Sequence, residues 1–379
     1  MRILYLALKY DYGQPERGYS FEHYNFYDSL RHMGVDLLYF DFMSLLRKYG
    51  KAGMNRRLWE VVKAEQPDLL FSVLFQDELD PRVLRKITVE TATVTVNWFC
   101  DDHWRFENFS RHWAPCFNWV VTTDADALPK YARMGYAHAL KSQWACNHHL
   151  YHPYQLSPAY EVTFVGQPHG NRRQIVEEIA AAEIPIIVWG RGWDAGRITQ
   201  AEMIRLFNQS RINLNLSNVS TGMLTPGKRL ASALRRRGAR LLDRLPGGKQ
   251  AHDWLRHTPL PQLVDSLTVP APFREQIKGR NFEVPGCGGF LLTNWVEGLE
   301  EYYDIGREIV CFSDTSELIA RLHYYLQHED ERLAIAGAGY ERTQREHTYT
   351  RRFEAIGKQI GLPFPPAPSG ETGHTEEVE

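Results

Sequence analysis

An alternation of apolar runs with helical segments repeats through the whole chain, and it constrains the fold more than any other feature. Six short apolar runs in the first half are expected to be strands, at residues 3–8, 35–40, 69–75, 92–99, 119–122 and 138–144. Helical patterns lie between them, at residues 21–32, 58–64 and 125–133 among others. The alternation starts again in the second half, with runs at residues 162–166, 186–189, 212–216, 290–293 and 308–312. Strands that alternate with helices predict an α/β protein with two doubly wound parallel sheets.

The length and the breaks in the pattern predict the domain boundaries. A chain of 379 residues is long enough for two domains, each with its own core. Residues 145–158 are polar and contain prolines, as is typical of a linker, so we expect domains at 1–150 and 151–362. An insertion at about 219–273 interrupts the second domain. Residues 363–379 are proline-rich and acidic and are predicted to be disordered.

Composition narrows the classes of partner and the compartment. The formal net charge of −2 gives no reason to expect a nucleic-acid-binding protein. Five cysteines with no Cys-x-x-Cys pair indicate reduced thiols rather than disulfides or a zinc site. The chain opens on a predicted strand without a signal peptide, and no window has the apolar length of a membrane span. We therefore expect a cytoplasmic protein.

Residues 275–293 carry the densest set of candidate binding groups. Seven residues separate Glu275 from Glu283, and Lys278 and Arg280 lie between them. Cations and the N-terminus of a short helix suit a diphosphate, and a carboxylate such as Glu283 can accept two hydrogen bonds from a ribose diol. The alternative is that both glutamates are solvated charges and that the glycines merely cap the helix. The Gly288-Gly289 turn and the buried strand that follow favour the binding site.

A second candidate phosphate site follows the first strand of the second half. That strand ends at Gly166, and Arg172 and Arg173 begin the next helix. A glycine-containing turn with arginines at a helix N-terminus binds anions readily.

Two further loops at strand ends are candidate contacts for the same ligand. Gly190, Arg191 and Trp193 follow a strand, and their ring and guanidinium offer stacking faces for a nucleobase. The long loop after the first strand contains Gly13 and Gly18 and could cover a bound sugar or phosphate. Its alternative is a surface loop held by its own tyrosines.

Asp102 and His103 are the candidate catalytic residues of the first half. They follow a predicted strand, where a carboxylate or imidazole could bind an acceptor hydroxyl or act as a general base. Asp101-Asp102 lacks the one-residue gap of the Asp-x-Asp metal motif, so we expect no metal. The alternative is that one of the aspartates caps the following helix.

A basic segment lies inside the insertion, at residues 228–245. Leucines share one helical face and arginines crowd the rest. This pattern predicts either an element at an anionic membrane surface, on the inner face of the membrane, or a solvated face above a packed leucine stripe.

The residues around Glu283 also resemble a known family. Glu-x7-Glu, a turn of small residues and a strand are similar to the donor site of retaining GT-B glycosyltransferases of family 4. The sequence GRNFEVPGCGGFLLTN resembles the CgeB-like branch, in which Arg-x-Phe-Glu and Cys-Gly-Gly precede the strand. The family turn carries an arginine and a lysine where this chain has Gln167 and Arg172. Arg172, Arg173, Lys278 and Arg280 would therefore have to share the diphosphate.

The resemblance implies a fold and an activity. The fold would be GT-B: two Rossmann-like domains that face a cleft, with C-terminal helices crossing back to the first domain. The activity would be transfer of a sugar from a nucleotide-diphosphate sugar to a hydroxyl of a glycan, a lipid-linked acceptor or a polysaccharide precursor, without a cofactor or metal. Retention, with Glu275 meeting the donor sugar, follows only from the family analogy; Asp102 as a base would suit inversion. A nucleotide-sugar epimerase and a non-catalytic binding module are the alternatives.

Overall fold

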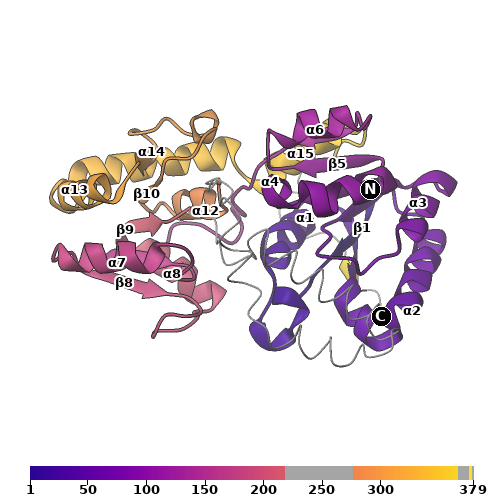
Figure 1. Cartoon of the computed structure of the whole chain (residues 1–379), viewed down its shortest axis with the longest axis horizontal. Coiled ribbons are helices and arrows are strands. Elements are labelled where there is room, and N and C mark those ends of the chain that lie inside the picture. Colours follow the sequence, from indigo (N-terminus) through magenta and orange to yellow (C-terminus); the bar gives the residue numbers. More distant parts are fainter. Residues whose placement is uncertain (218–275, 366–374, 378–379) are drawn as a thin grey trace, which may run out of the picture.

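Two parallel α/β domains lie side by side in the computed structural model, which describes residues 1–217, 276–365 and 375–377 (Figure 1). The insertion at 219–273, its basic segment at 228–245 and Glu275 lie outside the described residues. The strands of the first domain are β1 (Arg2–Ala7), β2 (Asp36–Asp41), β3 (Leu69–Ser72), β4 (Val94–Phe99), β5 (Trp119–Thr122) and β6 (Ala139–Lys141). Those of the second are β7 (Tyr160–Val165), β8 (Ile186–Trp189), β9 (Ser210–Asn215), β10 (Leu291–Asn294) and β11 (Val310–Phe312).

Both sheets have the doubly wound order that the sequence predicts. The first runs β12-β2-β1-β3-β4-β5-β6, with β12 at Thr375–Glu377, and the second runs β11-β10-β9-β7-β8. All pairings between these strands are parallel. The strand order reverses direction between β1 and β3 in one sheet and between β7 and β9 in the other. Ligands of open α/β sheets bind beside such points, at the carboxyl ends of the strands.

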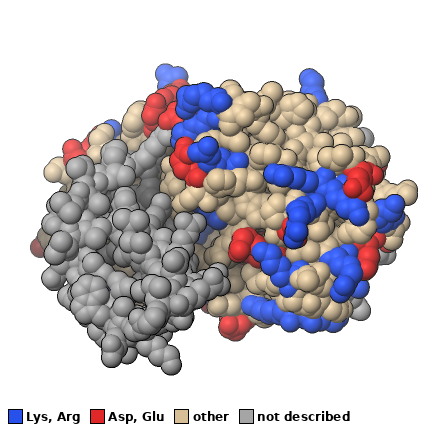
Figure 2. All heavy atoms as spheres, turned by 45° about the vertical axis from the view of Figure 1, so that its right-hand side comes forward, with Lys and Arg blue, Asp and Glu red and all other residues tan. Residues whose placement is uncertain are grey.

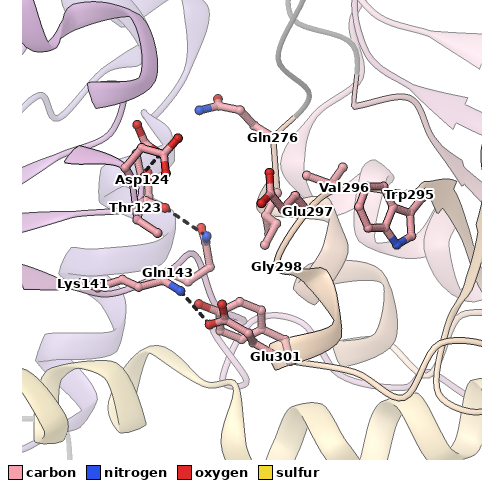
Figure 3. Close-up of a pocket in the computed structure, with 14 residues that line it drawn as sticks. Thr123, Asp124, Lys141, Gln143, Gln276, Trp295, Val296, Glu297, Gly298 and Glu301 are labelled. Carbon is pink, nitrogen blue, oxygen red and sulfur yellow. Dashed lines mark hydrogen bonds and ion pairs between the residues drawn. The ribbon is translucent and has the colours of Figure 1, made fainter. Parts of the chain in front are cut away.

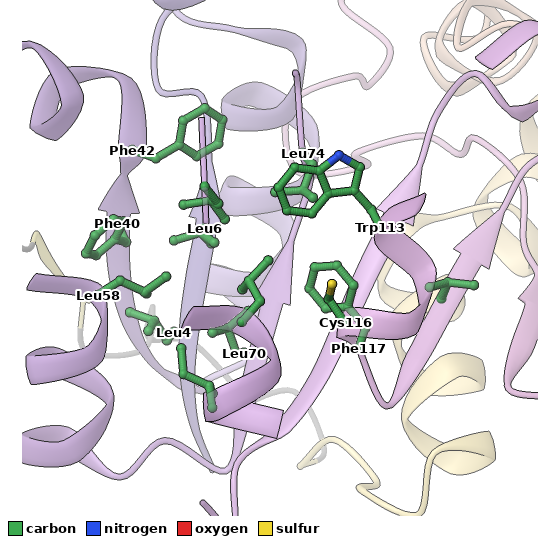
Figure 4. Close-up of a cluster of buried hydrophobic side chains, with 14 of the residues drawn as sticks. Leu4, Leu6, Phe40, Phe42, Leu58, Leu70, Leu74, Trp113, Cys116 and Phe117 are labelled. Atoms are coloured by element: carbon green, nitrogen blue, oxygen red, sulfur yellow. The ribbon is translucent and has the colours of Figure 1, made fainter. Parts of the chain in front are cut away.

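Helices cover both faces of the first sheet. They are η1 (Asp11–Gly13), η2 (Pro15–Arg17), the π-helix η3 (His23–Tyr27), α1 (Asp28–His32), α2 (Phe42–Glu65), α3 (Pro81–Glu90), α4 (Asp102–Arg105), the π-helix η4 (Phe106–Ser110), α5 (Arg111–Trp113), η5 (Ala114–Cys116) and α6 (Ala127–Arg133). Leu4, Leu6 and Phe40 point into the core against α2, α3 and the 113–117 segment (Figure 4). Ile3, Tyr5 and other alternate residues of the same strands pack on the opposite face. The strands are therefore buried on both sides, as their continuous apolar runs indicate.

The second sheet is also enclosed, and its last helix leaves it. Its helices are α7 (Arg172–Ala181), α8 (Gln200–Gln209), α12 (Arg280–Gly286), the 3₁₀ helix η6 (Leu299–Glu301), α13 (Thr315–Gln327), α14 (Glu329–Glu346) and α15 (Tyr349–Gln359). Phe353 and Ile356 of α15 belong to the core of the first domain, beside Phe26 and Leu30. The chain thus crosses back, as the fold prediction states, and α15 lies with the N-terminal domain in Figure 1.

The structure corrects two details of the prediction. The helix expected at 58–64 is the end of α2, which starts at Phe42, where Asp41 accepts a hydrogen bond from the Met43 N–H as the helix cap. The tail is not disordered throughout. Residues 375–377 form β12 along β2, since an edge strand offers unpaired N–H and C=O groups. Phe364 stacks on Phe353 at 6.2 Å between ring centroids.

Charges of both signs are interspersed on the described part of the face drawn in Figure 2, where lysines and arginines are mixed with aspartates and glutamates. Within the described ranges, no helix is both long and apolar enough to cross a membrane.

Candidate functional site

Three cations gather at the carboxyl ends of β7 and β9, between the two domains. The guanidinium of Arg172 donates to the carbonyl oxygen of Gln167, 3.0 Å away, and to that of Leu216, 2.5 Å away. Burial and the nearby Arg280 lower the pKa of Arg172 to about 10. Burial also lowers the pKa of Lys278, and Arg172 lowers it further while Asp101 opposes the change. Three neighbouring cations repel one another, so the cluster suits a ligand with more than one negative charge.

Glu283 holds one of these cations in place. Its side chain has no exposed surface, and one carboxylate oxygen forms an ion pair with Arg280. The other oxygen accepts a hydrogen bond from the Tyr151 hydroxyl, 2.9 Å away, and that hydroxyl in turn accepts one from Gln200, 2.6 Å away. Burial alone would lower the pKa of Arg280, but Glu283 and Tyr151 outweigh it and raise the pKa. In this arrangement the carboxylate faces Arg280, and its assignment to a ribose diol stays a prediction.

A buried polar network supports the start of α12, and sequence reasoning missed it. The amide oxygen of Asn281 accepts hydrogen bonds from the Lys278 N–H at 2.8 Å and from Asn215 at 3.3 Å. Asn215 also donates to the Thr293 hydroxyl at 3.0 Å, and the Ser217 N–H donates to the Asn294 side chain at 2.8 Å. The available signal was the polar residues that end the apolar runs of β9 and β10. Such a network fixes the two strand ends relative to α12.

Arg173 and the 190–193 loop turn away from the cation cluster. Arg173 donates to the carbonyl oxygen of Gly192 at 2.9 Å, and its guanidinium covers the ring of Trp193, 4.8 Å from the centroid. The Trp193 indole N–H donates to the carbonyl oxygen of Gly166 at 2.7 Å, and its ring packs in the core of the second domain. Arg191 is exposed. Arg173 therefore already covers one face of the Trp193 ring, and this face is not open for the expected stacking on a nucleobase.

The glycines of these turns serve the backbone. A Cβ on Gly190 would lie 2.3 Å from the carbonyl oxygen of Gly166, so only glycine lets the two turns approach. Gly288 faces the ring of Pro153, and Gly289 packs against Asn213 and the backbone of Phe207. The structure therefore places Gly288 and Gly289 in packing contacts behind α12.

The 10–19 loop contacts the second domain through an ion pair of Asp11, and its two glycines take no part in that contact. Gly13 is buried beside Met43, and Gly18 has open space around it. Asp11, in η1, pairs with Arg17 of its own loop at 2.9 Å and with Arg197 of the second domain at 3.0 Å. The loop thus bridges the two domains at one side of the site.

Asp102 lies inside the first domain. It is completely buried and accepts a hydrogen bond from the Tyr131 hydroxyl at 2.9 Å. Burial raises its pKa, against hydrogen bonds from Ser110, Thr122 and Tyr131. The carboxylate starts α4 rather than lining the cleft. His103, in the same turn, is partly exposed and lies 6.4 Å from the Trp104 ring centroid.

Asp101 and Glu22 are two further carboxylates of the first domain, and they interact electrostatically with each other. Asp101 ends the β4 segment, is partly exposed and interacts electrostatically with Lys278 across the domains. Burial raises the pKa of Glu22, and the carboxylates of Asp11 and Asp101 raise it further, against a hydrogen bond from Ser20. Phe21, the neighbour of Glu22, lies against Gly279, just ahead of α12. A carboxyl group with a raised pKa near Asp101, which itself interacts with Lys278, is a candidate acid or base that the sequence did not reveal.

A cavity of about 360 Å³ adjoins this site between the domains (Figure 3). Asp124 and Gln143 lie on the wall of the first domain, and Glu297 and Glu301 lie on the wall of the second. Lys141 pairs with Glu301 across the gap at 2.6 Å. No group of three or more metal-binding side chains was found in the described part of the chain.

Comparison with known proteins adds a family match over part of the chain, and the fold. Residues 172–247 and 262–358 match the family described as glycosyl transferase-like. HepE from Anabaena, solved with UDP and glucose, is 12% identical with a TM-score of 0.57, and the match covers 95% of this chain and 99% of that one. Sucrose-phosphate synthase from Thermosynechococcus elongatus is also 12% identical with a TM-score of 0.54, over 95% and 97% of the two chains. The chain has the GT-B fold. No curated protein gives a significant match.

The family match covers most of the second domain, which carries the cation cluster. It starts at Arg172, the first residue of α7, and extends into α15. The match and the fold together identify a glycosyltransferase-like enzyme. The GT-B prediction is thereby confirmed, including the crossing of the last helix.

Proposed function

We propose that this enzyme transfers a sugar from a nucleotide-diphosphate sugar to an acceptor hydroxyl in the cleft between its domains. The proposal rests on one observation: three cations lie close together beside β7 and β9, namely Arg172, Lys278 and Arg280. When the bond from sugar to diphosphate breaks, negative charge grows on the leaving diphosphate. Fixed cations that already lie there stabilise this charge without reorganisation. HepE, with the same fold, is described in complexes with UDP and with UDP-glucose, which makes a UDP-sugar the first donor to test.

The other site residues receive roles within this proposal. Glu283 orients Arg280 and meets the ribose if the donor draws the arginine aside. Glu275, outside the described residues, is proposed to meet the donor sugar, with retention of the anomeric configuration. Glu22 and Asp101 face the donor from the first domain and could bind the attacking hydroxyl. The start of α7 at Arg172 adds backbone N–H groups to the diphosphate site. The GRNFEVPGCGG sequence supports placing the chain in the CgeB-like branch.

The proposal is tested by following a labelled donor to its products. A panel of nucleotide-diphosphate sugars is first screened for a rise in melting temperature, since a ligand that binds the folded state stabilises it. The donor that raises it most is then supplied with radiolabel in the sugar, with and without candidate acceptors. We expect labelled glycoside and free nucleoside diphosphate. A free epimer of the sugar without glycoside would indicate an epimerase, and no binding across the panel would contradict the proposal.

A further inference from the structure

The cavity beside the cation cluster has a different electrical character from the cluster itself. Its lining among the described residues includes four carboxylates and one ammonium group: Asp124, Asp126, Glu297 and Glu301 against Lys141. Lys141 is engaged with Glu301, 2.6 Å away. The remaining carboxylates come from both domains, because Asp124 and Asp126 follow β5 and Glu297 follows β10. The cavity is therefore acidic where the neighbouring site is basic.

Among the described residues, the side chain of Gln276 connects the two regions. Gln276 lines the cavity, and its amide oxygen accepts a hydrogen bond from the Lys278 ammonium group at 2.9 Å. Lys278 belongs to the cation cluster. A ligand in the cavity would thus lie next to a diphosphate on the cations, which is where an acceptor must lie to meet the donor sugar.

The remaining lining suits a polyhydroxyl compound. Gln143 is 5% exposed and holds its place through hydrogen bonds with the Thr123 carbonyl oxygen at 3.3 Å and the Trp144 N–H at 2.9 Å. Trp295 also lines the cavity and is 47% exposed, so part of its ring is available to a ligand. Carboxylates accept hydrogen bonds from hydroxyl or ammonium groups, and an indole ring offers an apolar face to the C–H side of a sugar ring. A volume of about 360 Å³ is within the usual size of small-molecule sites.

We propose that this cavity is the acceptor site and that its acceptor is a neutral or amino sugar. This inference rests on the proposed function and adds the class of the second substrate. Hydroxyl or ammonium donors of the acceptor bond to Asp124 and Glu297, which face each other across the cavity (Figure 3). The same carboxylates repel a phosphate or uronic acid group, because like charges at close range repel each other. Sugar phosphates and glycans rich in uronic acid are therefore excluded as acceptors.

A glycan array tests the class of ligand directly. The wild-type protein, saturated with UDP, is applied to an array that carries neutral, amino, phosphorylated and uronic-acid glycans. Binding to neutral or amino glycans is the expected result. Binding only to anionic glycans, or to none while calorimetry shows that UDP is bound, would overturn the inference and leave the donor site standing. If calorimetry shows no binding of UDP or of any other nucleoside diphosphate, the proposed function itself fails.

Charge-removing variants test the cavity itself. Asp124→Asn with Glu297→Gln keeps the shapes and removes two negative charges. We expect transfer to methyl glucoside to fall about tenfold in kcat/KM, and the preference for methyl glucoside over glucuronate to narrow by at least as much. Donor hydrolysis without acceptor should stay within about twofold of the wild type. Glu300→Gln, an exposed neighbour outside the cavity lining, is the matched control and should change none of these values. An unchanged preference in the double variant, with donor hydrolysis intact, would overturn the inference.

Discussion

Arg172 and Arg173 are adjacent in the sequence, yet their guanidiniums face different parts of the molecule. Arg172 bonds to the carbonyl oxygens at the ends of β7 and β9, whereas Arg173 bonds to Gly192 and covers Trp193. Successive residues at the start of a helix point about 100° apart, so only one of them can face the cleft. The sequence could supply two arginines for a diphosphate, but the helix geometry selects one.

This selection predicts unequal effects of two alanine substitutions. Arg172→Ala should weaken UDP binding about 10- to 100-fold, because it removes a charge that is proposed to bond to the diphosphate, an interaction worth about 1.5–3 kcal/mol. Arg173→Ala should change the affinity by less than about threefold. Isothermal titration calorimetry on both variants measures the difference. Equal losses of UDP affinity in the two variants would show that the donor also reaches Arg173 and the 190–193 loop. The proposed preference for Arg172 would then be wrong.

Glu283 permits a sharper test of the anionic ligand. Glu283→Gln leaves Arg280 with a neutral partner, so we expect loss of detectable donor binding and a fall of about 2 kcal/mol in the free energy of unfolding. Tyr151→Phe is the control, because it removes one hydrogen bond to Glu283 and keeps the charge. Calorimetry and urea denaturation give the two quantities. Unchanged donor affinity in Glu283→Gln would remove both the ribose assignment and the positioning of Arg280.

Replacement of Gly190 by any other residue is expected to destabilise the folded protein. Its φ of 143° is a conformation that side-chain-bearing residues rarely adopt, and a Cβ there would meet the carbonyl oxygen of Gly166 at 2.3 Å. Gly190→Ala should therefore lower the free energy of unfolding by about 3 kcal/mol or more. Gly196→Ala, at φ 68° and with no heavy atom within 4 Å of the new Cβ, should cost only about 1 kcal/mol. Urea titrations compare the two, and similar losses would contradict the close approach of the turns.

At the scale of elements, the strands were predictable, and the interaction of Asp101 with Lys278 across the domains was not. Strand positions follow from apolar runs, and β5 and β8 lie at their predicted residues. The first half of α2 escaped prediction because Gly50 and Gly53 and several exposed polar residues give it no apolar stripe. The sequence cannot say which of the two adjacent aspartates the following helix turns inward, and in the structure it is Asp102.

The junction of α14 and α15 carries a pH-sensitive group, His347. It is 4% exposed, and one ring nitrogen donates to the Tyr302 carbonyl oxygen at 2.5 Å while the other faces Arg352 at 3.3 Å. Burial, with the charge of Arg352, lowers its pKa from 6.5 to about 4. The folded protein thus keeps the imidazole neutral where the unfolded chain would bind a proton. This contribution to stability is complete above pH 6.5 and is lost as the pH falls toward 4.

The expected consequence is a pH-dependent slope in the free energy of unfolding. His347 alone should lower the free energy of unfolding by nearly 1.4 kcal/mol for each pH unit below 6.5. By pH 4 this loss should reach about 3 kcal/mol. Urea denaturation between about pH 6.5 and 5, where most carboxylates remain ionised, measures this slope together with that of His149, whose pKa burial also lowers to about 4. The His347 share is the difference between the wild type and a His347 variant. His347→Asn should flatten the slope in that window, whatever its own stability. A His347 imidazole NMR signal that titrates near pH 6.5 would contradict the prediction.

At the scale of the whole molecule, the site exists only because two domains meet. Lys278 and Glu283 could be selected from a local motif, but Glu22, Asp101 and the cavity wall with Asp124 lie more than a hundred residues away in sequence. No periodicity links them to α12. Their approach depends on α15, which returns to the first sheet and packs Phe353 in its core. Long-range placement of this kind is the part of the site that composition and spacing could not supply.

The bridge between Asp11 and Arg197 predicts how the domains are held at their outer edge. The pair is 3.0 Å apart, with 24% and 46% of the side chains exposed, so its net contribution to unfolding should be small. A double-mutant cycle with Asp11→Asn and Arg197→Gln should give a coupling free energy below about 1 kcal/mol. Small-angle scattering should nevertheless show a larger radius of gyration for Arg197→Gln than for the wild type at about 0.1 M salt, because one link between the domains is gone. Raising the salt should reduce this difference by weakening the pair in the wild type as well. A radius that is unchanged by the substitution at low salt would mean that the Lys141–Glu301 pair and the packing of α15 hold the domains together without the 10–19 loop.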